Sequence, residues 1–217
     1  MLTITDLFDL DHTIAKDYLA QFTYPWEALA GIKDFILSVG PTLEDYDEVS
    51  PQVWVHKTAT VAPTAFLGGP CIIGPETEVR HCAFVRGSAL VGAGCVVGNS
   101  VELKNVILFD GVQTPHYNYV GDSILGYKSH MGAGSITSNV KSDKLPVVVR
   151  CGDERIDTGR KKVGAMLGDF VEVGCNSVLN PGSVIGRHSI IYPTSCVRGM
   201  LAENSIHKND GTVLSRK

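Results

Sequence analysis

The chain has 217 residues, of which 44% are hydrophobic and 19% charged, proportions typical of a globular protein. The formal net charge is −4 and the longest basic run is only Arg160 to Lys162, so the composition excludes an obvious nucleic-acid or anionic-membrane partner. No apolar run reaches membrane-spanning length, and the N-terminus lacks the order of a signal peptide, so we expect a cytoplasmic protein.

Residues 1–50 read as a helical segment followed by a polar linker. We expect helices over 13–22 and 25–39, because apolar residues such as Trp26, Leu29 and Ile32 recur at helical spacing, Pro25 suits a first turn, and Gly40 is a stop signal. These helices should lie on the outside or the end of the next domain.

The D-L-D-H-T stretch at 9–13 matches a phosphatase nucleophile loop, but no strand pattern precedes it, so a helix cap at Asp11 or Thr13 explains it better.

A six-residue repeat begins at Val55. Apolar residues occupy ten successive positions of this repeat and six positions of a second run. The first run is Val55, Val61, Leu67, Ile73, Val79, Val85, Val91, Val97, Leu103 and Phe109, and the second is Leu167, Val173, Leu179, Ile185, Ile191 and Val197. This period predicts a parallel β-helix whose apolar residues point into a narrow core.

The repeat breaks between these two runs. It fails after Phe109, resumes near Leu125 and Met131 four residues out of register, and is then interrupted over 139–162. Long segments without the pattern of their scaffold are more often functional than decorative. We expect the V-V-V-R stretch within 139–162 to form a strand outside the coil, as part of a hairpin. We place the β-helix domain at 51–199 and expect a loosely ordered tail at 200–217.

The cysteines contain no C-x-x-C pair, and a zinc site is not expected. We interpret all six as small, reduced core or corner residues: Cys71, Cys82, Cys95, Cys151, Cys175 and Cys196.

Several ordered motifs narrow the family. The stretches V-R-G, E-L-K-N, H-Y-N-Y-V-G-D-S and G-A-G-S-I-T-S-N, followed by E-R-I-D-T-G-R-K-K-V-G-A-M-L-G-D and N-P-G-S-V-I-G, fall within residues 80–199. In this order they resemble the C-terminal acetyltransferase domain of bifunctional sugar-1-phosphate nucleotidyltransferase/glucosamine-1-phosphate N-acetyltransferase enzymes, of the archaeal type. The resemblance implies an all-β fold, a left-handed parallel β-helix of hexapeptide repeats, in a homotrimer with sites between subunits. No counterpart of the nucleotidyltransferase half is present in these residues.

The resemblance also implies roles for individual residues. His116 matches the general base that deprotonates the substrate amine, and Glu102 matches an acidic residue that orients this histidine. Arg86 and Lys104 match residues that bind the sugar phosphate. Further substrate-contacting positions are Tyr119, His130, Asn139 and Lys144.

Acetyl-CoA is the implied co-substrate, and no metal is needed for the transfer. Ala133 matches the position whose backbone holds the pantetheine amide, and Gly132 and Gly134 would allow close approach. Two positions depart from the family pattern. His130 replaces an asparagine, which leaves the sugar open, and either Lys141 or Lys144 could stand for a conserved family lysine.

These observations leave competing functions. The leading hypothesis is an acetyl-CoA-dependent N-acetyltransferase acting on an amino-sugar 1-phosphate. The alternative is a non-catalytic β-helix that binds a sugar phosphate or partners a separate nucleotidyltransferase. A third hypothesis, an acyltransferase with an unrelated acceptor such as serine, fits the paired cations Arg86 and Lys104 less well.

Overall fold

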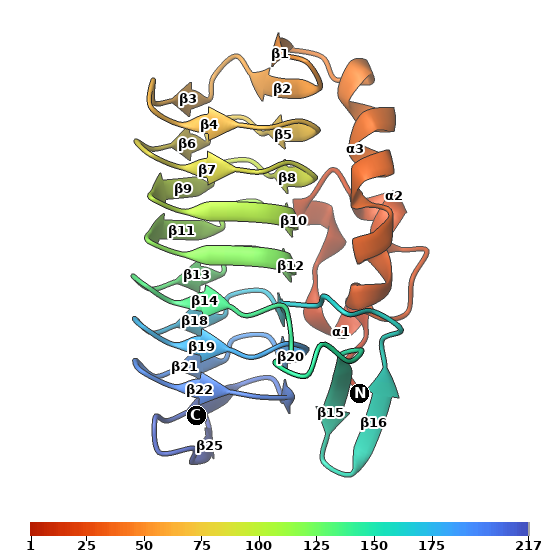
Figure 1. Ribbon diagram of the computed structural model, residues 1–217, viewed down its shortest axis with the longest axis vertical. Coiled ribbons are helices and arrows are strands. Elements are labelled where there is room, and N and C mark those ends of the chain that lie inside the picture. The colour runs from red at the N-terminus through yellow and green to blue at the C-terminus, as the bar shows by residue number, and fades with distance from the viewer. Residues whose placement is uncertain (217) are drawn as a thin grey trace.

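The computed structural model describes residues 1–216. Its body is a left-handed parallel β-helix of stacked coils, with a helical segment packed along one side (Figure 1). Val53, Cys71 and Ala89 pair in parallel, so one coil takes 18 residues, or three hexapeptides, in this part of the stack. This arrangement confirms the fold that the six-residue repeat predicts.

Three flat faces make up each coil. Face 1 is built from β2 (Val53–His56), β5 (Cys71–Ile73), β8 (Ala89–Val91), β17 (Ala165–Leu167), β20 (Ser183–Ile185) and β23 (Met200–Leu201). Face 2 is built from β3 (Thr60–Val61), β6 (Glu78–Val79), β9 (Val96–Asn99), β11 (Gln113–His116), β13 (His130–Met131), β18 (Glu172–Val173), β21 (Ile190–Ile191) and β24 (Ser205–His207).

Face 3 is built from β4 (Phe66–Leu67), β7 (Phe84–Val85), β14 (Ile136–Thr137), β19 (Val178–Leu179) and β22 (Cys196–Val197). Two longer strands, β10 (Glu102–Leu108) and β12 (Tyr119–Leu125), run from face 3 around a corner onto face 1. Antiparallel strands close the two ends of the stack, β1 (Tyr46–Ser50) on β2 and β25 (Val213–Ser215) on β24.

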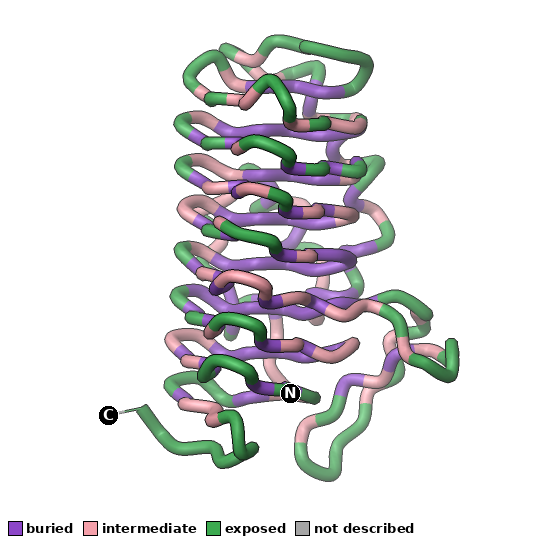
Figure 2. Tube along the Cα trace, turned by 60° about the vertical axis from the view of Figure 1, so that its left-hand side comes forward, coloured by how far each residue is buried: buried purple, intermediate pink, exposed green. Residues whose placement is uncertain are grey.

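Face 1 differs from the other faces because it is buried on both sides. Its strands are short runs of apolar residues, and their outward side chains form a column that includes Ile72, Leu90, Ile107, Ile124 and Met166. Burying one such side chain stabilises the fold by about 1.5–3 kcal/mol, so this column favours a covering layer. The strands of the coil are largely buried in Figure 2, whereas exposed residues concentrate at the corners and at the tip of a hairpin.

The helical segment supplies that layer. Its elements are α1 (Ile4–Leu7), η1 (Leu10–His12), α2 (Lys16–Leu19), η2 (Pro25–Ala30), α3 (Ile32–Val39) and η3 (Gly40–Thr42). α3 packs on β8 and β10, and η2 packs on β12, which places Leu29, Ile32 and Ile36 in the core.

The helices are shorter than the sequence predicts. The expected helix 25–39 is divided at Gly31, where an added Cβ would lie 2.7 Å from the Tyr18 hydroxyl oxygen. That hydroxyl donates a hydrogen bond to the Ala28 carbonyl, so close packing between the two helical stretches sets the break. The expected helix 13–22 is reduced to Lys16–Leu19, and Asp9 rather than Asp11 caps the turn before it.

Two other segments also differ from their expectations. Residues 200–216 do not form a loose tail: they add β23, β24 and β25 and so continue and close the coil. Within 139–162 the chain forms the antiparallel hairpin of β15 (Val148–Cys151) and β16 (Glu154–Asp157), which stands beside the coil (Figure 1). The V-V-V-R stretch provides β15, as the sequence indicates.

The cysteines are all free, but only some are core residues. Burial raises the pKa of the Cys71 and Cys95 thiols to about 12. Cys82, Cys175 and Cys196 are exposed on the coil. Cys82 and Cys175 lie in turns between strands, as corner residues do, whereas Cys196 on β22 and Cys151 on β15 are neither core nor corner residues of the coil. Within residues 1–216, no helix combines the length and apolarity needed to cross a bilayer.

Candidate functional site

The break in the six-residue repeat has a simple geometric origin. Leu108, not Phe109, pairs with Val91, so the interval from Leu103 to the next inward residue is five rather than six. Phe109 instead packs outside the coil, with its ring centroid 5.1 Å from that of Phe8.

The interval from Val120 to Leu125 is shortened in the same way. Leu103 pairs with Val120 and Leu108 with Leu125, so the coil between them takes 17 residues. Each of the two strands loses one residue, so the repeat is displaced backward by two residues in total. In a repeat of six, that displacement is the same as the four-residue shift seen in the sequence.

Both shortenings fall at the corner between faces 3 and 1, on strands β10 and β12. The corner residues Asn105 and Asp122 have φ values of 55° and 49°, in the left-handed region that asparagine and aspartate tolerate better than most residues. Because the two coils are shortened at the same corner, these polar residues stack one above the other.

Asp122 is the centre of the resulting network. Its side chain is 2% exposed, and its two carboxylate oxygens accept hydrogen bonds from Lys104 Nζ (3.0 and 3.2 Å), Asn105 Nδ2 (2.9 Å) and Asn139 Nδ2 (2.6 Å). The Asn105 amide also donates to the Leu29 carbonyl at 3.2 Å, which ties the network to the helical segment. A buried carboxylate needs such partners, since an unpaired one would be strongly disfavoured.

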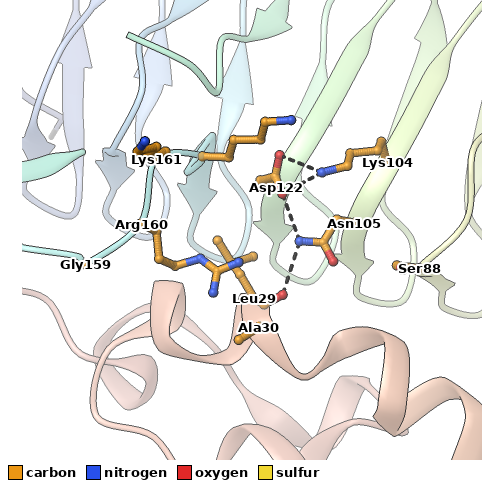
Figure 3. Close-up of a pocket in the computed structure, with 10 residues that line it drawn as sticks. Leu29, Ala30, Ser88, Lys104, Asn105, Asp122, Gly159, Arg160 and Lys161 are labelled. Atoms are coloured by element: carbon orange, nitrogen blue, oxygen red, sulfur yellow. Dashed lines mark hydrogen bonds and ion pairs between the residues drawn. The ribbon is translucent and has the colours of Figure 1, made fainter. Parts of the chain in front are cut away.

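A pocket of about 540 Å³ opens beside this network (Figure 3). Lys104, Asn105 and Asp122 line it from the coil, and Leu29 and Ala30 from η2. The other lining residues are Ser88 and the segment Gly159, Arg160, Lys161 and Lys162 at the end of the 139–162 interruption.

The two cations predicted to bind phosphate both have carboxylate partners. Arg86 Nη1 lies 2.8 Å from Glu102 Oε1 on face 3, and this contact raises the pKa of Arg86. Lys104 is held by Asp122. Glu102 therefore contacts Arg86, and within residues 1–216 it forms no hydrogen bond to His116.

Tyr119 and Asn139 lie together, as the resemblance implies. The Asn139 amide donates to the Tyr119 hydroxyl at 3.1 Å as well as to Asp122. Burial, followed by the nearby Asp122 and Glu102 charges, raises the pKa of the Tyr119 phenol, so the hydroxyl stays protonated. The phenol lies over Gly121, where any side chain would overlap it.

His116 stands at a different corner, between faces 2 and 3. It is exposed at the end of β11, and its carbonyl accepts a hydrogen bond from the Gly134 N–H at 3.0 Å. Ala133 therefore lies on the same corner one coil further along, as the stacking of the repeat requires. Within the described chain, the N–H groups of Ala133 and Cys175 have no hydrogen-bond partner, and so these two donors remain open along this corner.

Asn118 fixes this corner. It is 2% exposed, and its side-chain oxygen accepts from the His116 N–H at 3.2 Å. Its amide group donates to the carbonyls of Gly132 (2.8 Å) and Ser135 (3.1 Å). One buried amide therefore connects the backbone of the candidate base to the G-A-G turn.

Two predicted substrate-binding residues, His130 and Lys144, lie away from both the Asp122 network and the His116 corner in the single chain. His130 is on face 2, paired in register with Gln113, and its Nδ1 lies 2.9 Å from Glu172 Oε2. Lys144 is exposed in the loop before the hairpin, and Lys141 pairs with Asp143 at 3.0 Å. No group of three or more histidine, cysteine or acidic side chains in residues 1–216 is arranged to hold a metal.

The sequence patterns did not single out Asn105, Asn118 or Asp122. Asp122 had a usable signal, because it is an acidic residue inside the run V-G-D-S-I-L that otherwise reads as a strand. Asn118 gave no such signal, since asparagine is common in exposed turns.

Comparison with known proteins shows which families and relatives have similar sequences. The family model described as "GMPPB C-terminal domain" matches residues 69–173. Over 207 residues the chain is 31% identical to the bifunctional protein GlmU of Methanococcus maripaludis, covering 93% of this chain and 50% of that protein. It is also 37% identical over 94 residues to the bifunctional sugar-1-phosphate nucleotidylyltransferase/acetyltransferase of Sulfurisphaera tokodaii, covering 43% of this chain and 23% of that protein.

The chain resembles the C-terminal half of these bifunctional enzymes. It spans about half the length of the Methanococcus relative. Among solved structures, a hexapeptide transferase family protein from Anaplasma phagocytophilum aligns with a TM-score of 0.43 at 14% identity, covering 76% of this chain and 79% of that one. Perosamine N-acetyltransferase from Caulobacter crescentus aligns with a TM-score of 0.30 at 16% identity, covering 75% and 56%.

Proposed function

We propose that the chain is an acyltransferase that moves an acetyl group from acetyl-CoA to the amine of an amino-sugar 1-phosphate. The observation that carries this proposal is the corner shared by His116 and Ala133. An exposed imidazole and an open backbone N–H lie in neighbouring coils, about 5 Å apart along the stack. Beside them, face 3 presents Tyr119 and Asn139. The name of the Sulfurisphaera relative includes an acetyltransferase, which is the class of activity that we propose for this chain.

In the proposed reaction, His116 accepts a proton from the substrate ammonium, because only the neutral amine is nucleophilic. The amine then attacks the thioester carbon, and the tetrahedral oxyanion takes a hydrogen bond from a backbone N–H of the G-A-G turn. The nitrogen of the intermediate loses its second proton to solvent, and as the intermediate collapses the coenzyme A thiolate leaves and takes a proton from the imidazolium. The product is an amide, and no covalent enzyme intermediate forms.

We further propose that three copies assemble. His130 lies on face 2, away from the other predicted substrate residues on face 3, so a neighbouring copy would have to supply it. Phe66 and Phe84, which are 58% and 43% exposed, stack on face 3 and offer an apolar surface for this contact. Light scattering should give three times the mass of the chain, and a monomer that retains full activity would contradict the assembly.

The experiment that tests the activity is a thiol-release assay with acetyl-CoA and a panel of amino-sugar 1-phosphates. We expect turnover with at least one acceptor, and a decrease of about 10²–10⁴-fold in His116→Ala. The matched control is His81→Ala, which removes an exposed histidine two coils above His116. An absence of turnover with every acceptor, or an unchanged rate in His116→Ala, would contradict the proposal.

One observation favours a second candidate, a non-catalytic sugar-phosphate-binding module. Glu102 contacts Arg86 and not His116, so the base has no orienting partner within the described chain. This candidate predicts sugar-phosphate binding without affinity for acetyl-CoA. Calorimetry with each ligand separately distinguishes the two, since the acetyltransferase must bind both.

A further inference from the structure

Three basic residues at the end of the hairpin insertion line the pocket beside Asp122. Arg160, Lys161 and Lys162 follow β16 and reach the coil where the insertion rejoins it. Figure 3 shows Arg160 and Lys161 on one side of the pocket and Lys104 and Asp122 on the other, with η2 along the edge. Segments far apart in the sequence thus build one polar pocket.

The charges in this pocket do not balance. Asp122 is the single carboxylate among the lining residues of the described chain, and it already accepts from Lys104, Asn105 and Asn139. Within residues 1–216, Arg160, Lys161 and Lys162 form no ion pair with an acidic side chain. The pocket therefore carries an excess of three positive charges, which favours an anionic ligand.

An open hydrogen-bond donor marks the same pocket. The Nε atom of Arg160 is buried, and no acceptor in the described chain contacts it. A buried donor without a partner costs about 1–3 kcal/mol, so native structures rarely leave one open without a ligand or water to satisfy it. Arginine presents its N–H groups in a planar fork that suits the oxygens of a phosphoryl group.

The backbone holds these cations in place before any ligand binds. The Arg160 carbonyl accepts from the Val147 N–H at 2.7 Å, and its N–H donates to Thr158 Oγ1 at 3.2 Å. Lys162 forms an antiparallel bridge with Val140, next to Asn139. The basic run is therefore anchored on both sides, to the hairpin and to the corner that carries the Asp122 network.

We propose that this pocket binds the phosphoryl group of the sugar substrate through Arg160, Lys161 and Lys162. This inference rests on the proposed function and assigns its anion-binding residues. Arg86 and Lys104 already face carboxylates, whereas the insertion supplies cations that lack them. The pocket and the His116 corner lie at opposite edges of face 3, about three residues or 10 Å apart along a strand. A single sugar ring with its phosphate spans that gap over Tyr119.

Calorimetry without acetyl-CoA tests the inference separately from catalysis. The probes are glucosamine 1-phosphate, inorganic phosphate and unphosphorylated glucosamine. We expect Arg160→Gln to weaken glucosamine 1-phosphate binding about tenfold, and the triple variant with Lys161→Gln and Lys162→Gln to weaken it further, because each change removes a charge-assisted contact. Weak binding of glucosamine should not change. Binding to wild type should also fall as salt rises.

Arg155→Gln is the matched control, because Arg155 is exposed on β16 of the same hairpin and outside the pocket. Unchanged thermal midpoints verify folding. If the triple variant does not fold, the exposed Lys161→Gln alone must still weaken binding. Equal affinity of wild type and the variants for glucosamine 1-phosphate would overturn the inference.

The outcomes separate the two proposals. Arg160-dependent binding without acetyl transfer would leave this inference standing and contradict the proposed function. Acetyl transfer with a KM for glucosamine 1-phosphate that the triple variant does not change would contradict this inference alone. Binding of inorganic phosphate with no gain in affinity for the sugar phosphate would overturn the assignment of the pocket to the substrate.

Discussion

Two kinds of coil make up this molecule. The first coils take 18 residues each and keep apolar residues at every sixth position, whereas the coils built by β10 and β12 lose one residue each at the corner between faces 3 and 1. The regular coils contain few of the candidate site residues. The shortened ones carry Asp122, Asn118 and the predicted base, so a loss of one residue per coil accompanies the change from scaffold to site.

Replacing the central carboxylate should have the largest effect. Asp122→Asn keeps the shape and the left-handed backbone but removes the charge that pairs with Lys104. We expect it to lower the free energy of unfolding by about 2–3 kcal/mol, measured by urea denaturation. Glu76→Asn, at an exposed regular corner with φ of 55°, should change it by less than about 0.5 kcal/mol. Equal effects at both corners would mean that the network adds nothing to stability.

Asn118→Ala should come next. It removes the buried amide that joins the His116 backbone to the G-A-G turn, and should cost about 1–3 kcal/mol of unfolding free energy. It should also lower kcat in the thiol-release assay, because the base loses its position. Asn99→Ala, which removes an exposed bond to the His81 carbonyl one coil away, is the control. A loss of activity of the same size in both variants would contradict the positioning role of Asn118.

A methyl group at Gly121 should have a smaller effect on stability. The added Cβ would overlap the Tyr119 hydroxyl and lie 3.0 Å from Asn139 Nδ2, so the phenol must move. The cost should be about 1 kcal/mol, the low end for overpacking, because the overlapped atom is the far end of a side chain. We expect the KM for the sugar phosphate to rise, measured in the same assay. Gly68→Ala is the matched control. Gly68 has the same stacked position on face 3 as Gly121 but lies in a regular coil, and a Cβ added there would have its nearest contact at 3.1 Å. The idea fails if Gly121→Ala leaves both stability and KM unchanged.

The smallest effect should come from the exposed pair on face 3. Arg86→Gln removes the contact with Glu102, but both side chains are partly in solvent, and such pairs contribute little. We expect the urea midpoint to stay the same within error. A large decrease would show that face 3 is buried in an assembly, and Arg80→Gln, which breaks a similar exposed pair with Glu78, would then provide the comparison.

The sequence predicts most of the coil, because a β-helix repeats one local rule. Each inward position of the first run up to Leu103 could be assigned from the spacing alone, and the covered face is visible in triplets such as Cys71 to Ile73. The exact place of the slip could not be assigned from the sequence. Leu108 and Phe109 are both apolar and both buried, and only strand pairing decides which one points inward.

The site was less predictable, for a physical reason. Arg86, Lys104, Tyr119 and Asn139 were singled out by resemblance, but their partners depend on which corners stack. Asp122 lies 18 positions after Lys104 and 17 before Asn139, and the sequence does not show that these meet. The pocket also needs Leu29 from the helical segment and Arg160 from the insertion, neither of which follows the repeat.

The insertion has one more consequence. It leaves the coil after Asn139 and returns at Val163, whose N–H donates to the Asn139 carbonyl at 3.1 Å, while Gly164 donates to the Asp122 carbonyl at 2.8 Å. The two ends are thus fastened to each other, and the stack continues below as if nothing had been added. Such a loop behaves as an exchangeable cassette. Ligand preference could be altered by exchanging the part of this piece that lines the pocket, while Val147 and Val149, which are buried against the coil, are kept.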